Sequence, residues 1–215
     1  TWGKNTNGQL GVGTVSSSEE CPTTVTAVTG IVKDVSLGRN HTAIMMQVTP
    51  PNIFTCGLNG NGQLGHEDFV DRCDPMPVIA LDDRMIISVS CGSAHTAAVS
   101  QHGDLIVWGN GRNGQLGLFS GLDRDHEGPV QLPNFSEDQL VHVVCGQEIT
   151  CALTDRGDIY MCGRESAVGL GGSAAKNATD PTVPRLVEGI SNISCLSVGS
   201  VHVIALFPSN LDADA

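Results

Sequence analysis

The pentapeptide Asn-Gly-Gln-Leu-Gly occurs three times in the chain, at residues 7–11, 61–65 and 113–117. The copies start 54 and 52 residues apart, and each belongs to a related context, WGKNT, CGLNG or WGNGR. A sequence that repeats at a nearly constant step of roughly 50 residues is typical of a repeat architecture, in which each unit buries its apolar surface against the next. This repeat limits the choice of fold more than any single residue does.

A second motif lies between the pentapeptides. It reads VSLGRNHTAIM at 35–45, VSCGSAHTAAV at 89–99, VVCGQEITCAL at 143–153 and LSVGSVHVIAL at 196–206. Its glycines step by 54, 54 and 53 residues, at Gly38, Gly92, Gly146 and Gly199. The chain therefore carries four copies of this motif, and CGRESAVGLGG at 162–172 is a degenerate fourth copy of the pentapeptide loop.

Each repeat unit has the pattern of short strands. HTAAV at 95–99 is rich in small and β-branched residues, a turn SQHG follows, and DLIVW completes a hairpin over 95–108. TCALTDRGDIYMC at 150–162 repeats this hairpin. A proline-bearing segment follows every pentapeptide loop, and proline suits the start of a strand or an edge strand. Four short strands in roughly 50 residues predict a propeller blade.

We therefore predict an all-β protein, a β-propeller of about four four-stranded blades with a repeat of ~53 residues. The propeller occupies 1–207, with motif starts near 2, 56, 108 and 162, and 208–215 form a flexible tail. Glycines of the loops permit a positive φ and close backbone approach, and the loop leucines pack into the blade. The predicted structural repeat positions are Gly3, Gly8, Leu10, Gly11, Gly57, Gly62, Leu64, Gly65, Gly109, Gly114, Leu116, Gly117, His41, His95 and His202.

These motifs together resemble one known family. Gly-x-x-His-Thr-x-Ala-Leu, a glycine-bearing turn, a Trp-Gly step and Asn-x-x-Gly-Gln-Leu-Gly form the pattern of the regulator of chromosome condensation repeats, and the likeness covers nearly the whole chain. The WD-repeat and kelch signatures fit less well. The resemblance implies a seven-bladed propeller, so about four repeats imply a part of a seven-bladed ring in a longer chain, or an incomplete propeller completed by a partner. A shorter ring closing on itself is a further alternative, because the half-hairpins at the two ends are complementary.

Composition and charge narrow the classes of partner. The formal net charge of −12 is unsuited to nucleic acid or to anionic membrane surfaces, and no apolar run approaches the roughly 20 residues that span a bilayer. The sequence opens on Thr-Trp-Gly without a signal-like segment. Its eight cysteines form no Cys-x-x-Cys pair, and Cys56 and Cys162 stand where Trp2 and Trp108 stand in other repeats. We expect buried, reduced cysteines and an intracellular, reducing compartment, the cytoplasm or nucleus, with a cilium or an organelle as alternatives.

Several groups of residues could be interpreted as functional sites, and each also has a purely structural explanation. The repeated histidines could suggest a metal ring, but equivalent positions in different blades lie too far apart for one ion. Two tryptophans, each in a repeat slot, do not form a light-sensing cluster of the kind known in one branch of the family. Asp155, Asp158 and Glu148 flank a hairpin turn, where aspartate is favoured locally. We predict no catalytic residue, metal or cofactor.

The loops that follow the pentapeptides are acidic. The windows 12–24, 66–77, 118–129 and 172–184 hold 10 of the 23 acidic residues against three bases, and so carry −7 of the net charge. Equivalent loops should emerge on one face of a propeller. Ordinary solubilising charge is one explanation; an acidic docking face for a basic partner is the other. The candidate docking residues are Glu67, Asp68, Asp71, Asp74, Asp123, Asp125 and Glu127.

Two functions follow from the resemblance. The first is a non-catalytic scaffold that binds proteins, within a larger assembly, because many relatives use the propeller as a docking module. The second is guanine-nucleotide exchange on a Ran-type small GTPase, the activity of the family's founding member. The steps of 52 to 54 residues leave no room for an inserted wedge in these repeats. The expected partners are proteins, a basic surface or a small GTPase, and not nucleic acid or membrane.

Overall fold

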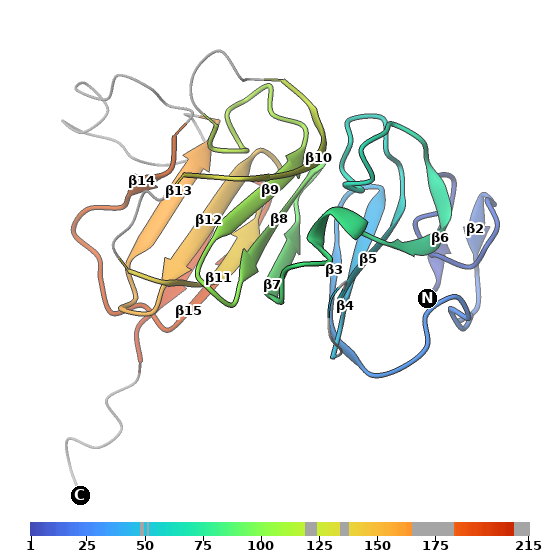
Figure 1. Cartoon of the computed structure of the whole chain (residues 1–215), viewed down its shortest axis with the longest axis horizontal. Helices are drawn as coiled ribbons and strands as arrows, with labels where there is room; N and C mark the ends of the chain where they lie inside the picture. The colour runs from blue at the N-terminus through green and yellow to red at the C-terminus, as the bar shows by residue number, and fades with distance from the viewer. Residues whose placement is uncertain (48–49, 51, 119–123, 134–137, 165–182, 209–215) are drawn as a thin grey trace, which may run out of the picture.

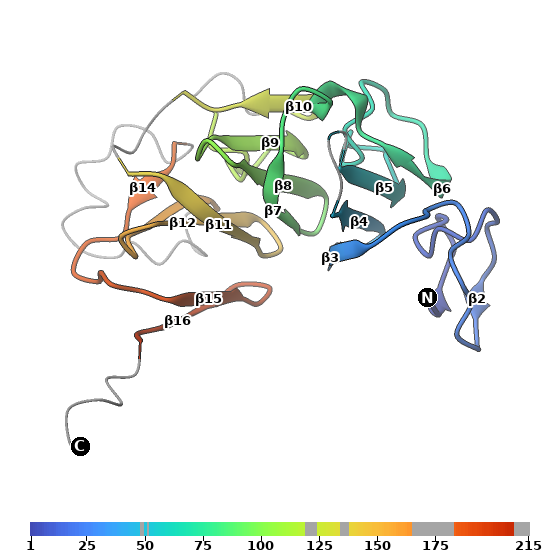
Figure 2. The same ribbon diagram turned by 60° about the horizontal axis from the view of Figure 1, so that its bottom comes forward.

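The computed structural model describes residues 1–47, 50, 52–118, 124–133, 138–164 and 183–208. Their strands form five antiparallel sheets, three of four strands and two of two strands. Together these sheets hold the strands of four blades, so the predicted all-β propeller architecture is confirmed. The seven-bladed ring is not tested by the described residues, which form an open arc (Figure 2).

Three sheets are complete blades. Blade 1 contains β3 (Val32–Leu37), β4 (His41–Met46), β5 (Ile53–Gly57) and β6 (Arg72–Pro77). Blade 2 contains β7 (Ile86–Cys91), β8 (His95–Ser100), β9 (Leu105–Gly109) and β10 (His126–Gln131). Blade 3 contains β11 (Leu140–Cys145), β12 (Ile149–Thr154), β13 (Ile159–Gly163) and β14 (Arg185–Leu186). The 3₁₀ turn η1 (Ile79–Leu81) links blades 1 and 2.

Two half-blades flank the complete ones. The N-terminal half-blade pairs β1 (Gly3–Lys4) with β2 (Ser18–Glu19), the two outer strands of a blade. The C-terminal half-blade pairs β15 (Cys195–Val198) with β16 (Val203–Leu206), the two inner strands of a blade. The half-blades are separate sheets at opposite ends of the arc, so the chain does not close a short ring on itself (Figures 1 and 2).

The repeated sequence produces a repeated register. His41 pairs with Gly57 in blade 1, His95 with Gly109 in blade 2, and position 149 with 163 in blade 3. The second strand of each complete blade is buried along its whole length, because strands flank it and blades cover it. Four prolines that follow pentapeptide loops, Pro75, Pro77, Pro129 and Pro184, fall in or beside the outermost strands β6, β10 and β14, as expected for edges that lack a hydrogen-bonding neighbour.

The hydrophobic core lies between the blades. One buried cluster joins Ala43 and Met45 of blade 1 to Ile86, Val89 and Trp108 of blade 2. Similar clusters join blade 2 to blade 3 and blade 3 to the C-terminal half-blade. The strands β3, β7, β11 and β15 form the inner side of the arc, and the loops that contain the pentapeptides emerge together along one edge (Figures 1 and 2). In the part of the chain that the structure describes, no helix is long and apolar enough to cross a membrane.

Candidate protein-docking face

The pentapeptide loop connects the third strand of a blade to its fourth. Gly62 and Gly65 have φ angles of 81° and 77°, which side-chain-bearing residues rarely adopt. A Cβ on Gly62 would lie 2.5 Å from the Cα of Glu127 in blade 2, so the loop also needs glycine for close approach. The amide of Leu64 donates to Asn59 Oδ1 over 2.9 Å, and the Leu64 side chain is fully buried. The predicted geometry of this loop is confirmed, and its glycines bring it against the next blade.

Each pentapeptide also holds the following blade through one carbonyl oxygen. The oxygen of Gln63 accepts from Thr96 Oγ1 over 2.8 Å and from Trp108 Nε1 over 2.9 Å, both in blade 2. The same bond joins Thr150 to Gln115 and Thr42 to Gln9. These bonds place successive loops at the same height, and so they build one continuous loop face.

Cysteine and tryptophan can occupy the same repeat position because both place a donor against the carbonyl oxygen of a pentapeptide glutamine. Cys56 Sγ lies 3.8 Å from the Gln9 carbonyl oxygen and Cys162 Sγ lies 3.7 Å from that of Gln115, the place taken by the Trp108 indole at Gln63. Burial raises the pKa of Cys56 to about 12, so its thiol keeps its proton and can donate. Burial likewise raises the pKa of Cys91 to about 12. The cysteines in the repeat slots are therefore buried donors or apolar packing residues.

The repeated histidines join blades. His41 Nε2 lies 3.0 Å from Thr96 Oγ1, and His95 Nε2 lies 3.0 Å from Thr150 Oγ1. Because each threonine gives its hydrogen to a pentapeptide carbonyl, its oxygen accepts, and Nε2 of the histidine carries the proton. Burial lowers the pKa of His41 to about 4 and that of His95 to about 3. Both rings are neutral at neutral pH and belong to different junctions; among the described residues, no three His, Cys, Asp or Glu side chains gather as metal ligands.

One junction replaces this polar pair by an apolar one. Ile149 stands where blades 1 and 2 have histidine, and Val203 stands where the following blade has threonine. Both belong to the cluster between blade 3 and the C-terminal half-blade. His202, the third predicted repeat histidine, is exposed at the open end of the arc. The two positions of a junction thus change together.

Two of the predicted docking carboxylates hold their own loop. Asp68 forms an ion pair of 2.8 Å with Arg72 and accepts from Asn59 Nδ2 over 3.0 Å. The hydrogen bond from Arg72 holds the pKa of Asp68 well below its usual range. Asp71 Oδ1 accepts from the Asn59 amide over 2.7 Å, although the residue stays exposed. Asp68 is therefore occupied by internal contacts, whereas Asp71 keeps part of its carboxylate for solvent.

Three other candidates meet where the loop of blade 1 touches blade 2. Glu67, Asp125 and Glu127 line an open hollow of about 600 Å³ with Arg124 and His126. The amide of Glu67, which has a φ of 60°, donates to the Glu127 carbonyl over 2.9 Å. Asp125 Oδ2 pairs with Arg112 over 2.8 Å. The structure therefore brings together carboxylates that lie 60 residues apart in sequence.

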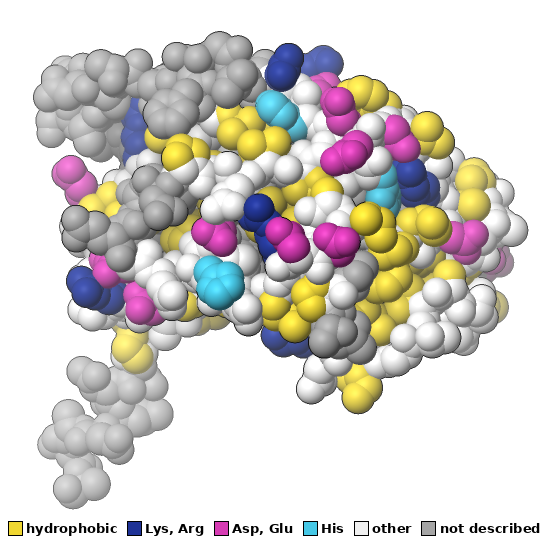
Figure 3. Space-filling model, in the orientation of Figure 1, with side chains coloured by type: hydrophobic (Ala, Val, Ile, Leu, Met, Phe, Trp, Pro, Cys, Tyr) yellow, Lys and Arg dark blue, Asp and Glu magenta, His cyan; other side chains and the backbone are white. Residues whose placement is uncertain are grey.

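The described candidates divide into two groups. Asp68 and Asp125 are half-buried and ion-paired. The other four are exposed and form no ion pair with any described residue: Glu67, Asp71, Asp74 and Glu127. Asp123 lies outside the described residues. Figure 3 shows Asp and Glu side chains grouped along the edge from which these loops emerge.

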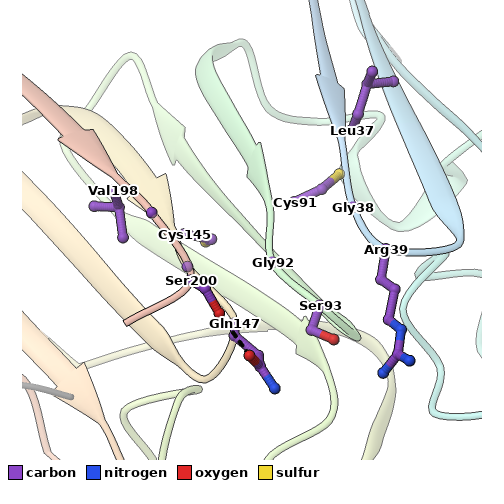
Figure 4. A pocket seen from close by; sticks show the side chains of 12 residues that line it. Leu37, Gly38, Arg39, Cys91, Gly92, Ser93, Cys145, Gln147, Val198 and Ser200 are labelled. Carbon is purple, nitrogen blue, oxygen red and sulfur yellow. Dashed lines mark hydrogen bonds between the residues drawn. The ribbon is translucent and has the colours of Figure 1, made fainter. Parts of the chain in front are cut away.

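A second hollow, of about 550 Å³, lies at the inner side of the arc and was not predicted from the sequence. It is lined by the residue that follows the repeated glycine in each unit, at Arg39, Ser93, Gln147 and Ser200 (Figure 4). Ser200 Oγ donates to Gln147 Oε1 over 2.6 Å. When the four glycine motifs are aligned, the position after the glycine identifies these lining residues, because equivalent positions of successive blades face the same axis.

The remaining carboxylates of interest are structural. Glu148 pairs with Arg164 over 2.8 Å, and the amide of Asp158 donates to Thr154 Oγ1 over 3.0 Å at a hairpin turn. Asp155 is exposed at the same turn. The described loop face thus offers negative charge for binding, chiefly through Glu67, Asp71, Asp74 and Glu127, which form no ion pair with a described residue.

The sequence pattern defined as the regulator of chromosome condensation (RCC1) repeat matches residues 1–45, 52–99 and 102–153, and a second pattern of the same description matches 86–115 and 140–167. The ultraviolet-B receptor UVR8 of Arabidopsis thaliana is 33% identical over 211 residues, covering 96% of this chain and 46% of the receptor. The mitochondrial RCC1 domain-containing protein RUG3 of the same plant is 29% identical over 217 residues, 95% of this chain and 48% of RUG3.

Among solved structures, Prp20p from Saccharomyces cerevisiae superposes with a TM-score of 0.80 at 18% identity, over 96% of this chain and 50% of Prp20p. That structure is described together with the binding of Prp20p to Gsp1p and histones. At this identity the likeness supports the fold alone. The chain spans about half the length of UVR8 and of RUG3.

Proposed function

The chain belongs to the RCC1 repeat family, and on this premise we propose that it is a non-catalytic propeller scaffold whose loop face binds a partner protein with a basic surface. One observation carries the proposal: four exposed loop carboxylates, Glu67, Asp71, Asp74 and Glu127, have no ion-pair partner among the described residues. Complementary charge at an interface speeds encounter and selects partners.

The architecture supports this choice over catalysis. The loops are tied to neighbouring blades by buried bonds, so they present a rigid charged edge. A rigid surface loses little conformational entropy when it binds, which favours affinity. The cysteines are free thiols, which persist in a reducing compartment. We therefore place the protein in the cytoplasm, the nucleus or a reducing organelle.

The test measures binding of a fluorescein-labelled decalysine peptide by anisotropy at several salt concentrations. We expect the double variant Glu67→Lys/Glu127→Lys to bind at least about tenfold more weakly than the parent, with a smaller salt dependence, because exposed charges are screened by salt. The matched control is Asp82→Lys/Asp155→Lys, which changes net charge equally on the opposite edge. Equal weakening by both double variants would mean that total charge, and not the loop face, governs binding.

A second function is guanine-nucleotide exchange on a Ran-type GTPase. The observation that favours it is the likeness of fold to Prp20p, whose structure is described with its binding to Gsp1p. The described blades carry no inserted wedge between their strands, so we rank exchange below scaffolding. Release of labelled GDP from a Ran-type GTPase in the presence of the protein decides between them: acceleration far above the spontaneous rate would establish exchange.

A further inference from the structure

The loop between β5 and β6 of blade 1 carries two exposed apolar side chains at its tip. Phe69 is 51% exposed and Val70 is 63% exposed. The loop of the N-terminal half-blade lies on one side of this loop and blade 2 lies on the other, so both neighbours along the arc are present and neither covers the tip (Figure 1). Phenylalanine is enriched at the centre of protein interfaces, which makes this tip a candidate contact.

The backbone on both sides of the tip is held in place. Asp68 Oδ1 accepts from the Val70 amide and from Arg72 Nη1, each over 3.0 Å. Arg72 Nη1 also donates to the Val70 carbonyl oxygen over 2.8 Å. On the other side, Asn59 Nδ2 donates to the Asp68 carbonyl oxygen over 2.8 Å. A preformed turn therefore presents Phe69 and Val70 to solvent, and a preformed surface loses little conformational entropy when it binds.

The open hollow between this loop and blade 2 begins beside the tip. Its lining includes Glu67, two residues before the tip, and Glu127, both exposed and without an ion pair to any described residue. Asp125 is already neutralised by its ion pair, so Arg124 is the one base of the lining that opposes the two glutamates. With His126 counted as neutral, the described lining keeps one net negative charge, which favours a Lys or Arg side chain as its occupant.

A carboxylate recurs at this place although a different residue supplies it. The Glu67 amide donates to a carbonyl oxygen of β10, and the Gly13 amide donates to the equivalent carbonyl oxygen of β6 at the preceding junction. The residues that follow these two acceptors are Gly128 and Asp74. A Cβ on Gly128 would lie 3.0 Å from Glu67 Cγ, and a Cβ on Gly13 would lie 3.2 Å from Asp74 Oδ1. At each of these two junctions an acidic residue therefore faces a glycine, and one carboxylate is kept.

The apolar tip recurs together with the carboxylate. Asn5 Nδ2 donates to the Thr14 carbonyl oxygen over 2.8 Å, which is the counterpart of the bond from Asn59, so Val15 is equivalent to Phe69. Val15 is 62% exposed. Figure 3 shows hydrophobic side chains among the acidic ones where these loops emerge. Solubilising charge would explain the carboxylates, but it does not explain an exposed apolar tip beside each of them.

We propose that Phe69, Val70, Glu67 and Glu127 form one docking surface for a partner protein that carries an apolar patch next to a Lys or Arg side chain. This inference rests on the scaffold function proposed above and specifies the chemistry of the partner. The apolar patch covers Phe69 and Val70, and the basic side chain enters the hollow. A lipid surface fits less well, because the carboxylates beside the tip are repelled by anionic headgroups.

Anisotropy titrations with two fluorescein-labelled decapeptides of equal charge, one of alternating Lys and Leu and one of alternating Lys and Ser, test the proposal. We expect the parent protein to bind the Lys-Leu peptide at least about tenfold more tightly, because only leucine buries apolar area against the tip. Phe69→Ser/Val70→Ser should reduce this preference to within about twofold and leave the affinity for the Lys-Ser peptide unchanged. The matched control is Ile31→Ser/Ile79→Ser, at residues 66% and 60% exposed where β3 begins and β6 ends, and it should keep the full preference.

The outcomes separate this inference from the scaffold function. Equal affinity of the parent for both peptides overturns the inference and leaves a charge-based scaffold standing, whereas binding of neither peptide overturns both. An equal loss of preference in the isoleucine control also overturns the inference, because any exposed apolar side chain would then serve. Glu67→Lys/Glu127→Lys should weaken the binding of both peptides, and unchanged binding would remove the hollow from the surface. Co-sedimentation with phosphatidylcholine vesicles that is lost in Phe69→Ser/Val70→Ser would assign the tip to lipid and refute a protein partner.

Discussion

The bond between His41 and Thr96 permits a quantitative test of how blades are held together. The imidazole donates from Nε2 over 3.0 Å to a hydroxyl that passes its own hydrogen to the Gln63 carbonyl over 2.8 Å. All three groups are buried. Thr96→Val removes the hydroxyl, keeps the shape and strands the Nε2 hydrogen away from water. Gln63 keeps the indole of Trp108 as a donor, so the histidine bears most of the loss.

The size of the effect follows from the cost of an unsatisfied buried donor. We expect Thr96→Val to lower the free energy of unfolding by about 2–3 kcal/mol, since such a group costs roughly 1–3 kcal/mol and one further bond is lost. His41→Ile in the same protein removes the stranded donor. The double variant reproduces the pair Ile149 and Val203, which the chain already accommodates in the same backbone, so it should lie within about 1 kcal/mol of the parent.

Urea unfolding followed by circular dichroism measures these free energies, with m-values compared to confirm that the unfolded reference is unchanged. The coupling energy of the cycle should be about 2 kcal/mol in favour of the double variant. Thr24→Val, at an exposed threonine, is the control and should change stability by less than about 0.5 kcal/mol. Additive effects of the two buried substitutions, with the double variant the least stable, would refute the coupling of the two positions.

Three further outcomes are expected. Gly92→Ala should lower the free energy of unfolding by about 2–3 kcal/mol in the same urea assay, because its Cβ would lie 2.6 Å from a carbonyl oxygen of blade 3. Gly60→Ala, which has open space around it, is the control and should be nearly neutral. Acid should destabilise the protein as pH falls from about 6.5 towards 4, because His41 and His95 have folded pKa values of about 4 and about 3 and the unfolded state therefore binds more protons in that window. Urea unfolding at each pH should show a loss of about 1.4 kcal/mol of unfolding free energy per pH unit and per histidine, and a smaller loss in His41→Ile/Thr96→Val. A thiol reagent should modify Cys21 and Cys195 rapidly in the native protein and the buried cysteines only after denaturation; rapid native labelling of all eight would contradict the burial of the repeat cysteines.

Local features were predictable because they depend on residues close in sequence. The glycines of the pentapeptide predicted positive φ at Gly62 and Gly65, and both adopt it. The small and β-branched residues of HTAAV, with the turn that follows, predicted the hairpin that β8 and β9 form. The aligned motifs also placed the repeat histidines one to a blade, and His41 and His95 indeed belong to different junctions.

The sequence predicted the docking carboxylates as one group, and only the structure separated those that are ion-paired from those that are not. From sequence, Asp68 and Glu67 are adjacent acids of one loop. In the folded chain Asp68 is held by Arg72, whereas Glu67 lies over the hollow with Glu127 of the next blade. Which carboxylate remains available depends on the partner that the fold brings to it, and that partner is often a residue of another blade.

The sequence by itself determined that the chain repeats, that each repeat forms short strands and turns, and that the units must stack to bury their apolar faces. These properties rest on glycine, proline and apolar spacing, which act over a few residues. The tertiary structure decided which groups meet across a junction: His41 with Thr96, Gln63 with Trp108, and Glu67 with Glu127. Contacts over a separation of one repeat exist only when neighbouring blades are packed, because the register and tilt of one sheet against the next fix which side chains come within hydrogen-bonding distance.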